Sequence, residues 1–418
     1  MHETAQKEES YILIGIQSEG EEVLERSLDE LRELVETSGA LAPWRLSQPL
    51  AFPHPKTYLG CGKAEELAAY LRATGADGIV CDDELSAVQV RNLEDLLQTK
   101  VLDRTLVILD IFAKRATTFE GKLQVELAQL SGLYARLIGK NSSLSRLGGG
   151  IGTRGPGEKA LEMNKRQIRN RMNHIRHDLK ETKQHRELLR EARKRTGLFH
   201  VAVVGYTNAG KSTLLNLMTQ ASVTAADQVF ATLEATTREC CLPNKKKILL
   251  TDTVGFIKKL PHHLIEAFKS TLEEARYADA LIHVVDASAP DAEERMALVY
   301  RILKELGADE LPVLTVFNKM DRVTGVLYLA DPRAESVLRL SLYDRQQAQA
   351  QIAEALRTLA TEKLRYVEGV LEFAKASLVA RIRREGSLLE EEYREDGIFI
   401  RAYVPAAVYG LLESKPDL

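Results

Sequence analysis

The stretch that decides the fold is Gly205-Tyr206-Thr207-Asn208-Ala209-Gly210-Lys211-Ser212. It matches the phosphate-binding pattern G-x-x-x-x-G-K-[ST] at every position. An apolar, β-branched run at residues 198–204 predicts a buried strand before it, and residues 213–218 predict a helix after it. The glycines let backbone amides approach phosphate oxygens at the start of that helix. We therefore expect a nucleoside triphosphate here, with Lys211 on the outer phosphates and the Ser212 hydroxyl on Mg²⁺. A chance glycine-rich turn is the weaker alternative.

Length and composition are those of an ordinary globular protein with two or three domains. The chain has 418 residues, of which 44% are hydrophobic and 28% charged, and its net charge is −3. Its apolar runs are too short to span a bilayer, and residues 1–10 lack the basic start and apolar core of a signal peptide. Four cysteines without a C-x-x-C pair indicate reduced thiols. We expect a cytoplasmic protein, and leave a membrane-associated fraction open.

Residues 10–115 alternate between strand-like and helix-like segments. Strands are expected at residues 11–16, 78–82 and 101–103, and helices at 21–37, from 60 to about 74, and at 86–97 with Ser86 as the cap. Alternation of this kind predicts a small α/β domain with a parallel sheet. Gly60-Cys61-Gly62-Lys63 lacks the spacing of a second phosphate loop, so a turn at a helix start is the favoured interpretation.

Two helical segments with a basic surface follow. Apolar residues recur every three to four positions in residues 104–138 and, more sparsely, in residues 158–195, which predicts an antiparallel αα-hairpin. Thirteen Lys and Arg stand against five Asp and Glu between Lys159 and Arg195. This imbalance suggests a polyanionic partner. A solvated helix face is the alternative.

The connection between these helices is rich in glycine and arginine. It contains Gly150-Ile151-Gly152-Thr153-Arg154-Gly155, which formally matches a dinucleotide fingerprint, but a helix precedes it where a strand is required. Arginine supplies forked donors and glycine permits close approach of the main chain, so we interpret the loop as a probe for a phosphate backbone, with a flexible linker as the alternative. The predicted RNA contacts are Arg146, Gly149, Gly150, Thr153, Arg154, Lys159, Lys165, Arg166 and Arg169.

Polar clusters follow several strands of the segment that contains the phosphate loop. Asp252-Thr253-Val254-Gly255 ends one strand, where its carboxylate can hold Mg²⁺ through water and the Gly255 amide can donate to a γ-phosphate. Asn318-Lys319-Met320-Asp321 ends another, and the Asp321 carboxylate can accept from guanine N1–H and the 2-amino group. Adenine would leave that carboxylate without a donor. We therefore predict GTP rather than ATP as the ligand, which disfavours a metabolic kinase.

A threonine-rich loop and a phenylalanine bear on hydrolysis. Thr232, Thr236 and Thr237 lie between the phosphate loop and Asp252, and each could add a Mg²⁺ ligand that exists only with the γ-phosphate. Phe256 stands where many small GTPases have a glutamine that orients the attacking water. Phenylalanine cannot do this, so we expect slow intrinsic hydrolysis that a partner accelerates.

The fold class predicted for the whole chain is α/β. We expect an N-terminal α/β subdomain (1–115), a basic helical hairpin with the glycine-rich loop (116–196), a doubly wound P-loop GTPase domain (197–362) and a small C-terminal α+β domain (363–418). In the last domain, residues 374–384 predict a helix, and residues 388–393 and 398–404 predict a hairpin.

These motifs together resemble the HflX family of GTPases. The resemblance rests on the phosphate loop, on Asp252-Thr253-Val254-Gly255-Phe256-Ile257, on Phe230–Arg238, on the loop from Gly148 to Gly157 and on Gln124–Leu130. It covers almost the whole chain. It implies a bacterial GTPase that binds the large ribosomal subunit, with the N-terminal domain on rRNA and the glycine-rich loop directed at the peptidyl transferase centre. It also implies that Thr232 is the switch threonine on Mg²⁺.

The predicted site residues follow from these motifs and the resemblance. Lys211, Thr232 and Gly255 are the expected catalytic residues, and Ser212, Thr232 and Asp252 the expected Mg²⁺ ligands. The expected contacts with GTP or GDP are Gly205, Tyr206, Thr207, Asn208, Ala209, Gly210, Lys211, Ser212, Thr213, Phe230, Ala231, Thr232, Leu233, Glu234, Asp252, Thr253, Val254, Gly255, Asn318, Lys319, Asp321, Ser341 and Leu342.

The leading functional hypothesis is a GTPase, expected to be a monomer, that binds the 50S subunit and its rRNA and splits stalled or idle 70S ribosomes. One alternative is a GTP-regulated factor for large-subunit assembly or RNA remodelling that does not split ribosomes. Another is an antibiotic-resistance variant that acts on drug-stalled ribosomes, because the loop reads Gly157-Glu158-Lys159 where the family usually has threonine after the glutamate.

Overall fold

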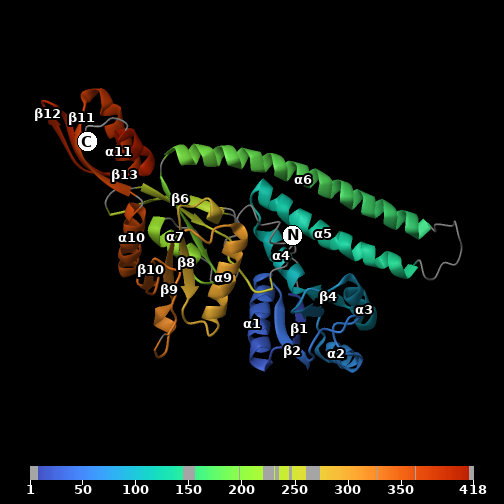
Figure 1. Cartoon of the computed structure of the whole chain (residues 1–418). Coiled ribbons are helices and arrows are strands. Elements are labelled where there is room, and N and C mark those ends of the chain that lie inside the picture. Colours follow the sequence, from blue (N-terminus) through green and yellow to red (C-terminus); the bar gives the residue numbers. More distant parts are fainter. Residues whose placement is uncertain are drawn as a thin grey trace, which may run out of the picture. The chain divides into compact units, whose positions relative to one another are not determined.

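The computed structural model in Figure 1 describes residues 8–144, 156–196, 198–219, 230, 235–243, 247–259, 274–326, 328–362 and 364–413. The chain divides into two compact units. Unit 1 contains residues 1–182, 228–233 and 259–269, and unit 2 contains residues 183–227, 234–258 and 270–418. No helix among the described residues is long and apolar enough to cross a membrane.

Unit 1 contains a four-stranded parallel sheet in the order β2-β1-β3-β4, which confirms the predicted parallel α/β architecture. Apolar side chains such as Ile12, Ile14 and Ile79 are fully buried in its core. The strand β2 was not predicted, because its sequence has two prolines and few β-branched residues; prolines are tolerated on an edge strand. The strands are β1 (Ser10–Gln17), β2 (Leu41–Pro49), β3 (Gly78–Cys81) and β4 (Lys100–Asp103).

The helices of this sheet region are close to the predicted ones. The side chain of Ser86 accepts from Gln89 N–H, and the Gln89 side chain reaches back to the Ser86 backbone, so the predicted cap of α3 is confirmed as a capping box. Leu24, Leu28 and Leu31 form the buried stripe of α1. The helices are α1 (Glu21–Thr37), α2 (Cys61–Thr74), α3 (Ala87–Leu97) and α4 (Arg104–Arg115).

The helical segment predicted for residues 104–138 is divided into α4 and α5 (Phe119–Leu144), so its continuity was wrong. Ala116 leaves the helical conformation, and the Thr118 hydroxyl accepts from Gly121 N–H at 3.0 Å, which restarts the chain as a new helix. The long helix α6 (Pro156–Thr196) returns alongside α5 in Figure 1. Within unit 1, Arg171 of α6 makes two hydrogen bonds to Glu126 of α5, at 2.7 and 2.8 Å, and the predicted αα-hairpin is confirmed.

Unit 2 contains the six-stranded sheet that carries the phosphate loop, in the order β10-β9-β8-β5-β7-β6. Five strands are parallel and β6 is antiparallel to β7, so the predicted doubly wound sheet is confirmed with an antiparallel edge. Its core contains fully buried residues from every central strand. The strands are β5 (Phe199–Gly205), β6 (Thr236–Cys241), β7 (Lys247–Asp252), β8 (Ala280–Asp286), β9 (Val313–Asn318) and β10 (Ser336–Arg339). The helices are α7 (Lys211–Thr219), α9 (Ala292–Leu306), the 3-10 turn η1 (Met320–Arg322) and α10 (Arg345–Glu362).

The C-terminal part of unit 2 is a three-stranded antiparallel sheet in the order β11-β13-β12. The predicted hairpin is confirmed as β12 (Ser387–Arg394) and β13 (Gly397–Pro405), whereas β11 (Leu364–Leu371) was not predicted. The helix predicted for residues 374–384 is present as α11 (Ala376–Glu385). It begins two residues later than predicted, because the 3-10 turn η2 (Phe373–Lys375) precedes it. The last helix is α12 (Ala406–Glu413).

Candidate nucleotide-binding site

The phosphate loop runs from the end of β5 to the start of α7, and glycine is required at two of its positions. Gly205 has φ of 151°, and a Cβ atom there would lie 2.3 Å from the carbonyl oxygen of Val284 in β8. Gly210 has φ of 106°, and its Cβ would lie 2.4 Å from Nδ2 of Asn318. The loop is therefore packed directly on the neighbouring strand and on the base-selecting motif.

Lys211 begins α7 and is almost completely buried. Its Nζ donates to the carbonyl oxygen of Tyr206 at 2.7 Å, so the loop itself holds the ammonium group. Burial lowers the pKa of Lys211 to about 8, and the charge of Asp252 opposes this only in part. An added Cβ on Gly255 would lie 2.8 Å from this Nζ, so the predicted γ-phosphate donor and the predicted phosphate lysine are neighbours.

The residues expected to hold Mg²⁺ include a matched pair of oxygen donors. The Ser212 hydroxyl donates to Oδ2 of Asp252 at 2.8 Å, and the Asp252 side chain is buried. A hydroxyl and a carboxylate at this separation fit Mg²⁺, which prefers oxygen ligands and retains water and phosphate oxygens as the others. Thr253 does not join them, because its hydroxyl donates to the Val203 carbonyl oxygen at 2.7 Å.

The threonine-rich loop is described only at its two ends. Thr236 and Thr237, left open by the sequence as switch residues, lie in β6, and the Thr237 hydroxyl is 2.8 Å from that of Thr251. Phe230 belongs to unit 1, where its ring meets Phe112 edge-on at 4.6 Å between centroids. The predicted nucleotide contacts Ala231, Thr232, Leu233 and Glu234 lie outside the described residues.

Asn318 and Asp321 occupy different environments in the predicted base-selecting motif. Asn318 is buried and structural: its Nδ2 donates to the Ala209 carbonyl oxygen at 2.8 Å, and its Oδ1 accepts from Leu342 N–H at 3.1 Å. It therefore joins the phosphate loop to the Ser341-Leu342 segment. Asp321 is exposed and accepts from the Ser341 hydroxyl, and this hydrogen bond lowers the pKa of its carboxyl. An exposed, ionised Asp321 has the charge that a guanine-selecting carboxylate requires.

The sequence reasoning did not include Asp286 as a site residue. It ends β8 and its Oδ2 lies 2.8 Å from Nζ of Lys319, which has the left-handed φ of 61°. This ion pair holds the Lys319 side chain at the carboxyl end of β8. The available signal was the position of Asp286 at the carboxyl end of a parallel strand, where ligand-site residues gather.

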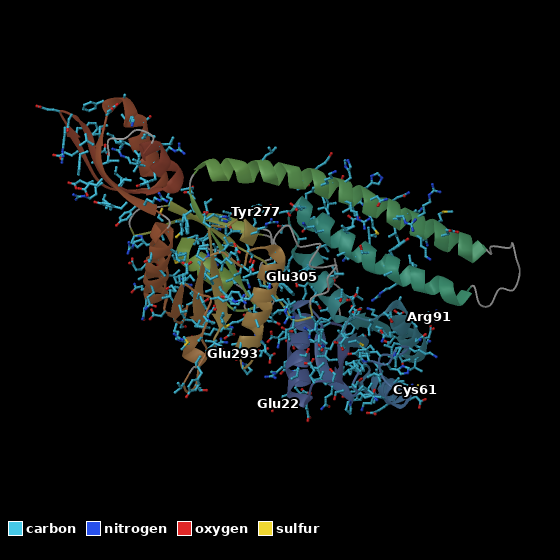
Figure 2. All side chains as sticks on the ribbon, in the orientation of Figure 1. Glu22, Cys61, Arg91, Tyr277, Glu293 and Glu305 are labelled. Atoms are coloured by element: carbon cyan, nitrogen blue, oxygen red, sulfur yellow. The ribbon has the colours of Figure 1, made fainter. Side chains whose placement is uncertain are left out.

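The predicted RNA contacts are described in part. Arg166 and Arg169 are exposed on α6 and Lys165 is half-buried; Arg169 lies over the ring of Tyr134 in α5, with its Cζ 5.5 Å from the centroid. Figure 2 shows many nitrogen-tipped side chains along α6. Arg146, Gly149, Gly150, Thr153 and Arg154 lie outside the described residues, as does the side chain of Lys159.

The fold and the site together define a P-loop GTPase, an enzyme that binds GTP and GDP and hydrolyses GTP. A protein named GTPase HflX from Lacrimispora saccharolytica is 51% identical over 410 residues, which cover 98% of this chain and 97% of that protein. The chain belongs to the HflX family. GTPase HflX of Caldanaerobacter subterraneus is 44% identical over 98% of this chain and 94% of its own length. GTPase HflX of Escherichia coli is 48% identical over 70% of this chain and 69% of its own length.

Family models cover most of the chain in three consecutive segments. They are described as GTP-binding GTPase N-terminal (residues 25–113), GTP-binding GTPase Middle Region (115–193) and 50S ribosome-binding GTPase (200–319). Among solved structures, one described as a complex of SsGBP with GDP is 25% identical with a TM-score of 0.50, and the match covers 85% of this chain and 99% of that one. The prediction of the family and of its GTPase activity is confirmed.

Proposed function

We propose that this protein binds the large ribosomal subunit in its GTP state and splits stalled or idle 70S ribosomes into subunits. The observation that carries the proposal is one chain with a guanine-nucleotide site and a long helix of basic surface. The match of residues 200–319 to a model described as a 50S ribosome-binding GTPase supports the same partner. Because ribosomes are the substrate, the cytoplasm is the expected place of action.

The charge distribution of α6 favours RNA as the surface contacted. Met172 and Ile175 are its buried apolar residues in unit 1, and most of its Lys and Arg side chains there are exposed. Arg171 is held by Glu126, whereas Arg166 is exposed on the same helix. Exposed arginines on a rigid helix can donate to successive phosphates of an RNA backbone.

We infer the following roles for the nucleotide-site residues. Lys211 and the loop amides bind the phosphates, Asn318 fixes the loop against the base site, and Asp321 selects guanine. Ser212 and Asp252 would hold Mg²⁺, which neutralises charge on the β- and γ-phosphates when bound. Gly255 offers its amide to the γ-phosphate, and Thr232 is the proposed switch residue.

Phe256 makes partner-dependent hydrolysis the expected behaviour. Its side chain is 1% exposed, and its amide and carbonyl groups bond to the phosphate loop. It therefore offers no polar group to the attacking water. A ribosomal partner would supply or order the missing group.

Two measurements test the proposal. Sucrose gradients with 70S ribosomes and a non-hydrolysable GTP analogue should show conversion to subunits; binding to free large subunits without splitting would instead favour an assembly factor. GTP hydrolysis should rise at least about a hundredfold when large subunits are added, on the order of the gain from one positioned catalytic group. A high rate without ribosomes, unchanged by their addition, would contradict the proposed trigger.

The RNA-contact surface has its own test with a matched control. Arg166→Glu on α6 should weaken large-subunit binding and reduce the salt dependence of binding by about one counterion, with intrinsic GTP hydrolysis unchanged. Arg301→Glu reverses another exposed arginine, on α9, and should leave binding unchanged. If both changes weaken large-subunit binding equally, binding depends on the net charge of the protein rather than on a specific surface of α6. Arg154→Glu tests the glycine-rich loop in the same assay.

A further inference from the structure

Tyr206, the second residue of the phosphate loop, has a buried side chain that points at the segment after Gly255. The residue is 4% exposed. Its hydroxyl accepts from the backbone N–H of Lys258 at 2.7 Å. All three residues belong to unit 2. A loop residue whose backbone frames the phosphates thus also contacts the chain that follows the predicted γ-phosphate donor.

Two backbone hydrogen bonds act at the same place. Phe256 N–H donates to the Gly205 carbonyl oxygen at 3.2 Å, and Thr207 N–H donates to the Phe256 carbonyl oxygen at 2.8 Å. The segment of residues 255–258 therefore runs beside the phosphate loop as a short parallel bridge. The Tyr206 hydroxyl provides a third attachment of this segment to the phosphate loop, made by a side chain.

Arg295, in the first turn of α9, packs on the Tyr206 ring. The guanidinium Cζ of Arg295 lies 4.6 Å from the ring centroid, and Nε of Arg295 is 2.7 Å from Oδ1 of Asp291. The other oxygen of Asp291 is 2.8 Å from Nζ of Lys258. The buried carboxylate of Asp291 thus contacts both Arg295, which lies over the Tyr206 ring, and Lys258, whose backbone N–H donates to the Tyr206 hydroxyl. In Figure 2, Glu293 and Glu305 mark the two ends of this helix.

We propose that Tyr206 is a positioning residue for GTP hydrolysis: its hydroxyl keeps residues 255–258 where the Gly255 amide can donate to the γ-phosphate. The inference rests on the proposed role of Gly255. GDP has no γ-phosphate, so loss of the hydroxyl should affect GTP and leave GDP binding intact. A purely structural role would weaken both nucleotides together.

The test is Tyr206→Phe, which keeps the ring under Arg295 and removes only the hydroxyl. Dissociation constants for fluorescent GDP and a fluorescent non-hydrolysable GTP analogue are measured with Mg²⁺, together with kcat and KM for GTP. The preference for the GTP analogue over GDP should fall about fivefold, the effect of one net hydrogen bond, and kcat should fall by a similar factor. GDP affinity should stay within about twofold, inside the usual context dependence of such effects.

Tyr300→Phe is the matched control. Tyr300 is also a buried tyrosine of unit 2 under an arginine, with Arg333 Cζ 4.8 Å from its ring centroid and its hydroxyl on Asp331. It lies on α9 and touches neither the phosphate loop nor residues 255–258 in any described hydrogen bond. Loss of the Tyr300 hydroxyl should lower thermal stability without changing the preference between the GTP analogue and GDP.

Gly255→Ala separates the two proposals. Alanine keeps the amide, but its Cβ would lie 2.8 Å from Nζ of Lys211 and 2.9 Å from Cγ2 of Thr207, so the amide must shift. If the preference is unaltered by that shift, the role of Gly255 fails and the Tyr206 inference fails with it. If Gly255→Ala lowers the preference and Tyr206→Phe does not, only the Tyr206 inference is overturned. Equal weakening of GDP and the GTP analogue by Tyr206→Phe also overturns it.

Discussion

His283 should make the stability of the GTPase sheet depend on acidity. It lies in β8 with 1% exposure, its ring is edge-on to Tyr300 at 5.1 Å, and its Nδ1 is 3.9 Å from Oδ2 of Asp331. Asp331 also accepts from the hydroxyls of Tyr300 and Thr315. Burial lowers the pKa of His283 from 6.5 to about 4; the charge of Asp331 opposes the change and that of Lys211 adds to it.

The sign and size of the effect follow from these two pKa values. Between pH 6.5 and 4 the unfolded chain binds a proton on His283 and the folded chain does not, so the free energy of unfolding falls as pH falls. The full difference corresponds to about 3 kcal/mol, of which about 2 kcal/mol is lost by pH 4.5. This contribution is complete above about pH 7.5, because the histidine is then neutral in both states.

His283→Phe provides the comparison, because it keeps a ring against Tyr300 and removes the titrating group. Hydrogen exchange of the β8 and β9 amides, corrected for intrinsic rates, measures the opening free energy at pH 7 and 4.5. The wild type should lose about 2 kcal/mol more than the variant over this interval. At pH 7 the variant should be about 1 kcal/mol less stable than the wild type, because phenylalanine is slightly larger. At pH 4.5 it should be about 1 kcal/mol more stable, because it lacks the titrating group. Equal losses in the two proteins would refute the reasoning.

Three further changes test separate parts of the molecule. Lys211→Ala should abolish GTP hydrolysis, because the phosphates lose their buried cation; wild-type turnover would remove Lys211 from the site. Asp321→Asn should shift preference from guanosine towards xanthosine nucleotides in competition binding, because an amide can donate to the 2-oxo group of xanthine. Arg104→Met should destabilise unit 1 by about 3 kcal/mol in urea unfolding, because buried Asp82 and half-buried Glu30 lose their common cation while Asp82 retains its ion pair with Lys259. A loss below about 1 kcal/mol would show that water compensates those carboxylates.

The central strands were predictable from the sequence, whereas several edge strands were not. The strands β5, β8 and β9 are buried on both faces, so their sequences are continuous apolar runs. The strands β2 and β6 lie at sheet edges, where one side needs no partner and proline or polar residues are tolerated. The sequence of β6 is polar enough that Thr236 and Thr237 were interpreted as part of a loop.

The sequence was sufficient to predict those site motifs that follow the carboxyl ends of parallel strands. Asp252 and Asn318 end strands of one sheet, so their meeting with the phosphate loop follows from topology. The pairing of Asp286 with Lys319 and the contact of Tyr206 with Lys258 depend on side-chain lengths and on the packing of α9. No periodicity in the sequence carries that information.

The burial of Lys211 has a consequence for the stability of the protein without bound nucleotide. Removing water from an ammonium group opposes folding, and among the described residues the Tyr206 carbonyl oxygen accepts from this one. That cost is met when the chain folds, so with Lys211 in its proposed role a triphosphate would meet a preorganised cation. Bound nucleotide therefore acts as part of the fold: at a hundred times its dissociation constant it adds about 2.7 kcal/mol of stability. A cell that keeps guanine nucleotides plentiful thereby also protects this enzyme from unfolding.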